Sequence, residues 1–341
     1  MAEFEATQHP LEVRNSNSIS PSMKESKLPC TIGQLLAITL PIMVAGIFAA
    51  IFVPLYVKHK KENTKFLVLY ANDTANNGTS DTDWFKDYEE NITNVTYATL
   101  TPKGGYDNIL IFLGGIGNVA NDFFETLFKT DNTFVPKRTK IYSICGYPRI
   151  MQFAIDYYGE NFTFIPIPAW FNIDSQGRLC PTEHDFTEAK ASLNIMLDEI
   201  DRIKSVENVD YKNIYLSGFS QGGLMTTYIL LNSRHELGGY IVFSGGVFDH
   251  DFSENEIINP LNEDQIKKLQ NVENYHIIAT HSYKDDTVFY PMAAPSYQYY
   301  FGNYTDFKLV SFGLLLHTLP EQPTHKIVRN WLEERIENNK K

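Results

Sequence analysis

The chain has 341 residues, and its 41 acidic against 29 basic side chains produce a formal net charge of −12. A surface that binds nucleic acid needs a surplus of Lys and Arg, so this balance excludes nucleic acid as an expected partner. With 43% hydrophobic and 13% aromatic residues, the chain can bury a large core, which excludes wholesale disorder. Cys30, Cys145 and Cys180 have no paired spacing, which argues against a disulfide framework and a cysteine-based zinc site. The nine histidines show no metal-ligand spacing, so neither a metal nor a cofactor is predicted.

The first long feature is an uncharged run of 26 residues from Ile32 to Val57. As a helix it would extend over ~39 Å, enough to cross a hydrocarbon core ~30 Å thick. The basic cluster Lys58–Lys61 follows it, at the place of an interfacial anchor. The polar stretch 1–31 before it is longer than the basic leader of a cleaved signal peptide. We expect a disordered polar tail over 1–31 and a transmembrane signal anchor over 32–57.

The side of the membrane on which the rest of the chain lies stays open. Three positive residues precede the run and four follow it closely, which leans towards a cytoplasmic C-terminal domain. Asn-x-Ser/Thr glycosylation motifs point the other way, to a lumenal or extracellular domain, and crowd the stretch after the run. These motifs begin at Asn72, Asn77, Asn91, Asn94, Asn161 and Asn303.

After the anchor, residues 58–100 are predicted to form a stalk with leading strands, and 101–341 a single domain. Short β-rich runs ending in Gly or polar turns alternate there with amphipathic helical patterns, the clearest near 193–203 and 327–336. This alternation is typical of an α/β fold, in which helices cover both faces of a mostly parallel sheet. The strand candidates are Asn108–Leu113, Lys140–Cys145, Asn213–Ser217, Tyr240–Ser244, His276–Thr280 and Phe307–Phe312.

The most informative motif is Gly218-x-Ser220-x-Gly222. An apolar strand ends just before it and an apolar helical run follows it, as in a nucleophile elbow, a sharp turn that lifts a serine Oγ above the sheet. The flanking glycines let strand and helix pass closely. Ser220 is therefore the candidate nucleophile.

A serine hydroxyl needs a base and an acid, which in this fold class follow it in the order Ser, acid, His. His317 lies in a loop just after the last strand candidate, where a base would reach Ser220. His276 begins a strand and His325 enters the last helix, so both are read as structural. His281 precedes the best acid and would break the order.

For the acid, Asp285 and Asp286 both follow the strand candidate that ends at Thr280. Adjacent residues seldom point the same way, so one of them is expected to hold the imidazole N–H, and Asp285 is preferred. Asp249 or Asp251, after the preceding strand, are the alternative.

An oxyanion needs two backbone N–H donors where the negative charge develops. One candidate is the N–H of Gln221, the residue after the nucleophile. The other is the N–H of Ile116, in the turn Gly114-Gly115-Ile116-Gly117 that ends a hydrophobic strand. This turn lacks the lysine of a Walker phosphate loop and the spacing of a dinucleotide site.

Four stretches of residues 105–335 together resemble the acyl-protein thioesterase/carboxylesterase group of α/β-hydrolases, also called the phospholipase/carboxylesterase family. The most specific is the elbow, which matches Gly-Phe-Ser-Gln-Gly-Gly; the acid stretch is similar to His-Gly-Asp-x-Asp-x-x-Val. The four are Ile111–Gly117, Pro168–Asn172, Ser217–Gly223 and His281–Val288.

The resemblance implies an α/β-hydrolase fold, places the catalytic Asp on Asp285 and the base on His317, and implies hydrolysis of acyl thioesters or oxygen esters. Trp170 and Phe171 would line the acyl channel or its lid, or else pack in the core. The sequence departs from the family pattern where Gly114 replaces a His, and where Ser282 and Tyr283 replace a Gly and an Asp. Typical members also lack a membrane anchor.

The leading hypothesis is a membrane-anchored, single-pass serine hydrolase that cleaves acyl esters or thioesters at a bilayer. Its partners would be the membrane and an acylated protein, a lysophospholipid or a small ester. Two alternatives stay open: a weakly active or inactive hydrolase-fold membrane protein with a binding role, and a serine peptidase of the same fold.

Overall fold

A computed structural model describes residues 88–124, 133–160, 163–175, 177, 183–248, 267, 275–302, 306–312, 316–319 and 324–340. The predicted tail 1–31, the predicted anchor 32–57 and the stalk up to residue 87 lie outside this part of the chain. None of the helices within the described residues has both the length and the apolar character needed to cross a bilayer.

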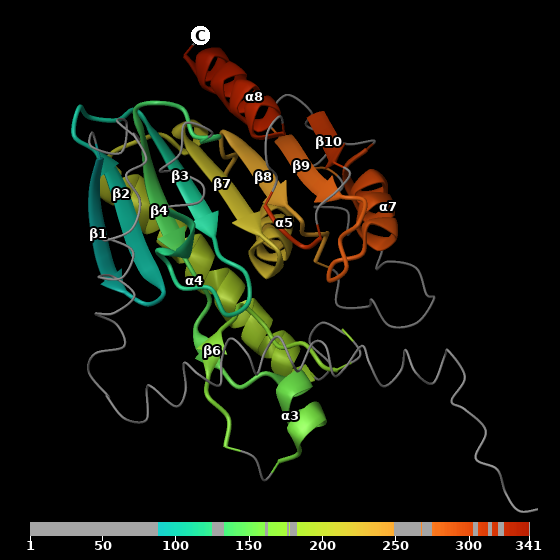
Figure 1. Cartoon of the computed structure of the whole chain (residues 1–341). Helices are drawn as coiled ribbons and strands as arrows, with labels where there is room; N and C mark the ends of the chain where they lie inside the picture. The colour runs from blue at the N-terminus through green and yellow to red at the C-terminus, as the bar shows by residue number, and fades with distance from the viewer. Residues whose placement is uncertain are drawn as a thin grey trace, which may run out of the picture. The chain divides into compact units, whose positions relative to one another are not determined.

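The centre of the fold is an eight-stranded sheet with the order β1-β2-β4-β3-β7-β8-β9-β10 (Figure 1). The strand β2 runs antiparallel to both β1 and β4, and all other neighbours are parallel. The predicted mostly parallel sheet is therefore confirmed. The strands are β1 Tyr88–Asn94, β2 Tyr97–Pro102, β3 Asn108–Leu113, β4 Thr139–Ile144, β7 Ile214–Phe219, β8 Gly239–Phe243, β9 His276–Ser282 and β10 Asp306–Phe312.

Helices cover both faces of this sheet. Apolar residues of α4 (Glu183–Glu207), α5 (Gln221–Asn232) and α7 (Tyr290–Phe301) belong to one core cluster. Those of α8 (Thr324–Asn339) belong to the cluster on the other face. A small excursion between β4 and α4 holds α3 and a second, two-stranded sheet, and a short 3-10 turn precedes β7. The bounds are β5 Pro148–Arg149, α3 Gln152–Tyr158, β6 Ile167–Pro168 and η3 Tyr211–Asn213.

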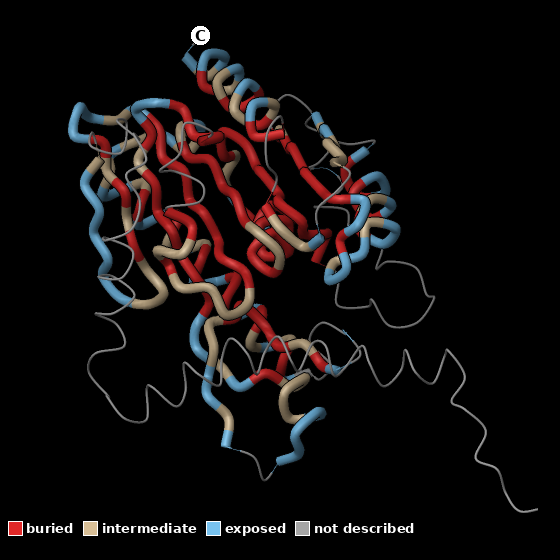
Figure 2. The backbone as a smooth tube through the Cα atoms, viewed as in Figure 1, coloured by how far each residue is buried: buried red, intermediate tan, exposed pale blue. Residues whose placement is uncertain are grey.

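The central strands alternate their side chains between the two cores. In β3, Ile109 and Ile111 face the core of α4 and α5, whereas Leu110 and Phe112 face that of α8. All six residues of β3 are buried, because both faces of the strand are covered. Figure 2 shows this buried centre and the exposed outer strand β1. This is why the central strands read as continuous apolar runs.

The topology creates one switch point. The chain leaves β3 for β4 on one side and later returns to β7 on the other side. Ligands in open α/β sheets bind at the carboxyl ends of strands where the connections diverge in this way. The carboxyl ends of β3 and β7 carry the Gly114–Gly117 turn and Ser220 respectively.

Candidate active site

Ser220 occupies a sharp turn between β7, which ends at Phe219, and α5, which begins at Gln221. Its backbone has φ 56° and ψ −120°, a left-handed conformation that is strained for a residue with a Cβ. Two backbone hydrogen bonds hold it: the Ser220 N–H donates to the Phe243 carbonyl at 2.9 Å, and its own carbonyl accepts the Leu224 N–H at 3.1 Å. This is the geometry of a nucleophile elbow.

Two glycines make the elbow possible because backbone passes backbone there. A Cβ on Gly218 would lie 2.2 Å from the Gly222 carbonyl oxygen, and one on Gly222 would lie 2.1 Å from the Leu113 carbonyl oxygen. No side chain fits at either position, so α5 starts directly against the ends of β7 and β3.

His317 contacts Ser220 and Asp285 at the same time. Its Nε2 lies 2.7 Å from the Ser220 Oγ, and its Nδ1 lies 2.9 Å and 3.0 Å from the two Asp285 carboxylate oxygens. A carboxylate only accepts, so Nδ1 carries the proton and Nε2 is free to accept the serine proton. The imidazole also stacks on the Phe219 ring, with 5.0 Å between centroids. The three predicted side chains thus form one hydrogen-bonded row.

Asp285 is buried, and its carboxylate accepts several N–H groups. The backbone N–H groups of Thr287 and Val288 donate to Oδ1 at 3.0 Å and 2.8 Å. Burial raises the pKa of this carboxyl, but hydrogen bonds from His281, His317 and the Thr287 backbone outweigh it and hold the pKa well below its usual range. Asp285 is therefore ionised at neutral pH.

The neighbouring carboxylate and the other acid candidates take no part in this row. Asp286 is exposed, whereas Asp285 is buried. The alternatives Asp249 and Asp251 lie outside the described residues. Ser282 replaces a family glycine, yet no left-handed residue is needed there: its carbonyl accepts the Asp285 N–H at 3.3 Å in a tight turn.

Two hydrogen bonds hold the turn after β3 in place. The Gly114 N–H donates to the Ile144 carbonyl at 2.9 Å, and the Gly115 N–H donates to the Asn118 Oδ1 at 3.0 Å. A Cβ on Gly114 would lie 2.5 Å from the Cys145 Sγ. The Cys145 thiol therefore leaves no room for a side chain at Gly114, the position at which the family pattern has a histidine.

The two predicted oxyanion donors lie on the elements expected of them. Gln221 opens α5, where the first N–H groups have no carbonyl to bond within the helix. Ile116 lies half-buried in the turn after β3. Gly115, next to Ile116, approaches the nucleophile, since a Cβ there would lie 3.2 Å from the Ser220 Cβ. Both donors stay predictions for the oxyanion role.

Trp170 and Phe171 are almost fully buried, at 2% and 0% exposure. The Gln221 side chain spans both residues: its Oε1 accepts the Trp170 N–H at 2.7 Å and its Nε2 donates to the Phe171 carbonyl at 2.8 Å. The Trp170 indole N–H donates to the Gly114 carbonyl at 2.8 Å. These contacts are those of core residues that brace the turn after β3, and an acyl-binding role for the pair stays a prediction.

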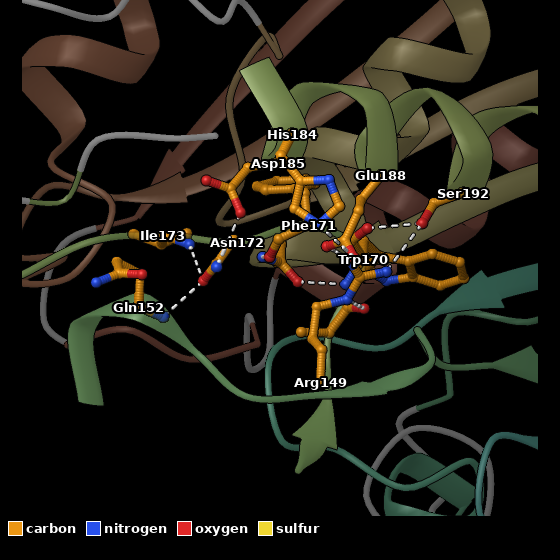
Figure 3. Close-up of polar contacts among 12 residues, drawn as sticks. Arg149, Gln152, Trp170, Phe171, Asn172, Ile173, His184, Asp185, Glu188 and Ser192 are labelled. Carbon is orange, nitrogen blue, oxygen red and sulfur yellow. Dashed lines mark hydrogen bonds and ion pairs between the residues drawn. The ribbon is translucent and has the colours of Figure 1, made fainter. Parts of the chain in front are cut away.

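A polar network behind these residues fixes their backbone (Figure 3). Arg149 donates to the Ala169 carbonyl at 2.9 Å and pairs with Glu188 at 2.6 Å. Ser192 donates to the Trp170 carbonyl at 2.7 Å. The segment 168–172 is therefore tied to α4 as well as to the start of α5.

Asn172, the last residue of the stretch Pro168–Asn172, completes this network. Its Oδ1 accepts the backbone N–H groups of Gln152 and Ile173, and its Nδ2 donates to the buried Asp185 at 3.0 Å. A carboxylate at 172 would face the Asp185 carboxylate instead. The amide of Asn172 can donate to the buried Asp185 carboxylate, which a second carboxylate could not do when ionised.

Sequence reasoning missed three supporting side chains. One is the Gln221 amide, which bonds the backbone of Trp170 and Phe171. The second is the Ser244 hydroxyl, which donates to the Thr318 carbonyl at 2.8 Å. The third is His281, whose Nε2 lies 3.3 Å from Asp285 Oδ2. The available signal was position alone: each lies at the carboxyl end of a central strand or just after it. Among the described residues, no group of three or more His, Cys, Asp or Glu is arranged to hold a metal ion.

A family model described as phospholipase/carboxylesterase matches residues 94–336. The chain belongs to this family. Acyl-protein thioesterase 1 of Cryptococcus neoformans is 20% identical over 152 residues, which cover 45% of this chain and 60% of that protein. The chain thus matches less than two thirds of the length of this curated relative.

Solved structures share the fold. Acyl-protein thioesterase 2 of Zea mays aligns with a TM-score of 0.52 at 16% identity, over 71% of this chain and 99% of that chain. A variant of SOBER1 from Arabidopsis thaliana aligns with a TM-score of 0.50 at 18% identity, over 67% of this chain and 100% of that chain. This confirms the α/β-hydrolase fold for the family domain.

Proposed function

We propose that this protein is a serine hydrolase of acyl esters or thioesters, with Ser220 as nucleophile, His317 as base and Asp285 as the acid that orients the base. The observation that carries the proposal is the 2.7 Å contact between the His317 Nε2 and the Ser220 Oγ, with the other imidazole nitrogen on a buried carboxylate. Family membership and the similarity to acyl-protein thioesterases support the choice of esters and thioesters.

In the proposed reaction, the Ser220 Oγ attacks the acyl carbonyl while His317 Nε2 takes the hydroxyl proton. The tetrahedral oxyanion accepts hydrogen bonds from the backbone N–H groups of Ile116 and Gln221. Collapse breaks the bond to the leaving alcohol or thiol, which receives the proton from His317, and leaves an acyl-enzyme. Water, deprotonated by the same imidazole, then releases the carboxylic acid and restores the Ser220 hydroxyl.

A fluorophosphonate probe tests the nucleophile. The wild-type protein should be labelled, and Ser220→Ala should abolish both labelling and hydrolysis. Ser205→Ala is the control, since this serine lies exposed on α4 and donates only to the Asp201 carbonyl of its own helix. Wild-type protein that shows no label would favour the inactive, ligand-binding alternative.

The substrate class is tested by comparing turnover of p-nitrophenyl acyl esters, acyl thioesters and peptide amides. We expect kcat/KM for the ester and the thioester to exceed that for the amide by at least about 100-fold. A preference for the amide would support the peptidase alternative instead.

We further propose that residues 32–57 anchor the protein in a bilayer as a single pass, which would hold enzyme and acylated substrate at the same surface. The uncharged run supports this. Two glycosylation motifs lie in the described residues, and both asparagines, Asn91 and Asn94, are exposed on the edge strand β1. Glycosidase treatment of the membrane-bound protein, compared with an Asn91→Gln/Asn94→Gln variant, would reveal a lumenal domain. Protein left in the soluble fraction would contradict the anchor.

A further inference from the structure

A second histidine lies against the carboxylate of Asp285. The side chain of His281 is fully buried at the end of β9, and its Nε2 lies 3.3 Å from Asp285 Oδ2. The same Nε2 lies 2.7 Å from the Val288 carbonyl oxygen. The imidazole also packs edge-on against the Tyr290 ring, with centroids 5.8 Å apart. His281 thus contacts the acid at Oδ2, whereas the backbone donors bond Oδ1.

The hydrogen-bond geometry determines which nitrogen of His281 carries the proton. A carbonyl oxygen only accepts, so the Nε2 facing Val288 must be the N–H. The other nitrogen, Nδ1, is buried without a hydrogen-bond partner among the described residues. A proton there would be unpaired in the interior, at the full cost of its desolvation. The Nε2–H form is the one that fits this site.

The donors around Asp285 then fall into two sets. Oδ1 accepts the backbone N–H groups of Thr287 and Val288, whereas Oδ2 faces the His281 Nε2–H. His317 Nδ1 lies within 3.0 Å of both oxygens. Without His281, His317 would be the remaining donor to Oδ2 among the residues that the structure describes, so the plane of the carboxylate would be held less tightly.

We propose that His281 is a positioning residue for the hydrolysis: its Nε2–H, shared between the Val288 carbonyl and Asp285 Oδ2, fixes the plane of the carboxylate that orients His317. The inference rests on the proposed function of Ser220, Asp285 and His317. Val288 connects the parts, because its N–H donates to Oδ1 while its carbonyl accepts from His281. The acid, its turn and the second histidine form one closed ring of contacts.

Two substitutions separate this role from simple core packing. His281→Met keeps an adaptable side chain but removes the donor, and it should lower kcat about 10-fold with KM changed less than about 2-fold. His281→Gln keeps an amide N–H that can reach the carboxylate, and it should restore kcat to within about 3-fold of the wild type. His276→Gln, at the other end of β9 and partly exposed, is the control and should leave kcat unchanged.

If His281 acts by positioning Asp285, the loss of kcat in His281→Met must depend on the Asp285 carboxylate. A double-mutant cycle tests this dependence. In an Asp285→Asn background, His281→Met should change the rate of fluorophosphonate labelling of Ser220 less than about 2-fold. Equal losses in both backgrounds, a change in KM alone, or a His281→Met variant with wild-type kcat would each overturn the inference. Counting labelled sites corrects kcat for any unfolded fraction.

A measurement on the unmodified protein covers the case in which His281→Met does not fold. Long-range ¹⁵N–¹H NMR correlations should show His281 protonated at Nε2, and protonation at Nδ1 would overturn the inference. This readout does not depend on activity. If the wild type hydrolyses no ester or thioester, the proposed function has failed, and the NMR result still decides the His281 contact.

Discussion

On the nucleophile side of the site, backbone lies against backbone. Gly222 approaches the Leu113 carbonyl oxygen so closely that a Cβ would lie 2.1 Å from it, and Ser220 is held in a left-handed conformation between β7 and α5. On the acid–base side, the contacts involve side chains: the Asp285 carboxylate contacts His281 and accepts the backbone N–H groups at 287–288, and the Ser244 hydroxyl donates to the Thr318 carbonyl next to His317. Substitutions of the close-packed glycines on the first side should therefore mainly reduce stability, and those on the second side should mainly reduce kcat.

The largest expected effect lies on the acid–base side. Asp285→Asn should lower kcat by about 10⁴-fold, because an amide presents an N–H or a poorer acceptor to His317 and disturbs its tautomer. Asp286→Asn is the matched control, since Asp286 is the exposed neighbour, and should keep activity within about 2-fold. Steady-state ester hydrolysis measures both; equal losses would show that the two carboxylates act together.

The next effect lies on the nucleophile side and concerns stability. Gly222→Ala should lower the free energy of unfolding by about 3 kcal/mol or prevent folding, because two backbones must separate to admit the methyl group. Gly104→Ala is the control, because a Cβ there meets nothing within 4 Å. Urea unfolding compares the two variants, and a stable, inactive Gly222→Ala would contradict the division between the two sides.

The pH dependence of stability sharpens the acid–base side further. The pKa of Asp285 is depressed in the folded protein, burial being outweighed by the donors around it. Its contribution to stability is therefore present above the unfolded-state pKa of about 4 and is lost as the pH falls towards the folded value. Asp285→Asn should lower the free energy of unfolding by about 2 kcal/mol at pH 7 and by less at pH 3, measured by urea unfolding. An equal loss at both pH values would rule out the charged form as the cause.

The smallest effect is expected from Ser244→Ala. Losing the hydroxyl that bonds the Thr318 carbonyl should loosen the His317 loop, lower kcat about 5-fold and cost about 1 kcal/mol of stability. Ser205→Ala removes a similar hydroxyl-to-carbonyl bond on the exposed face of α4 and should leave both quantities unchanged. A loss of stability with full kcat would mean that Ser244 acts on the fold alone.

Much of the fold was predictable because it depends on local patterns. Six strand candidates match β3, β4, β7, β8, β9 and β10 to within about two residues at each end, since buried parallel strands are continuous apolar runs. The strand β1 was not predicted, because most of its residues are polar and exposed. The helix α7 was not predicted either, since prolines lie at its start and in its interior.

By itself, the sequence determined the elbow at Ser220 and the alternation of strands and helices, because both follow from residue spacing along a short stretch. Only the tertiary structure decided which carboxylate meets which histidine. Asp285 and His317 are 32 residues apart, and His317 and Ser220 are 97 apart; only the strand order of the sheet brings them together. The same holds for Trp170 and His281, whose neighbours come from distant elements, so that their roles follow from packing and not from spacing.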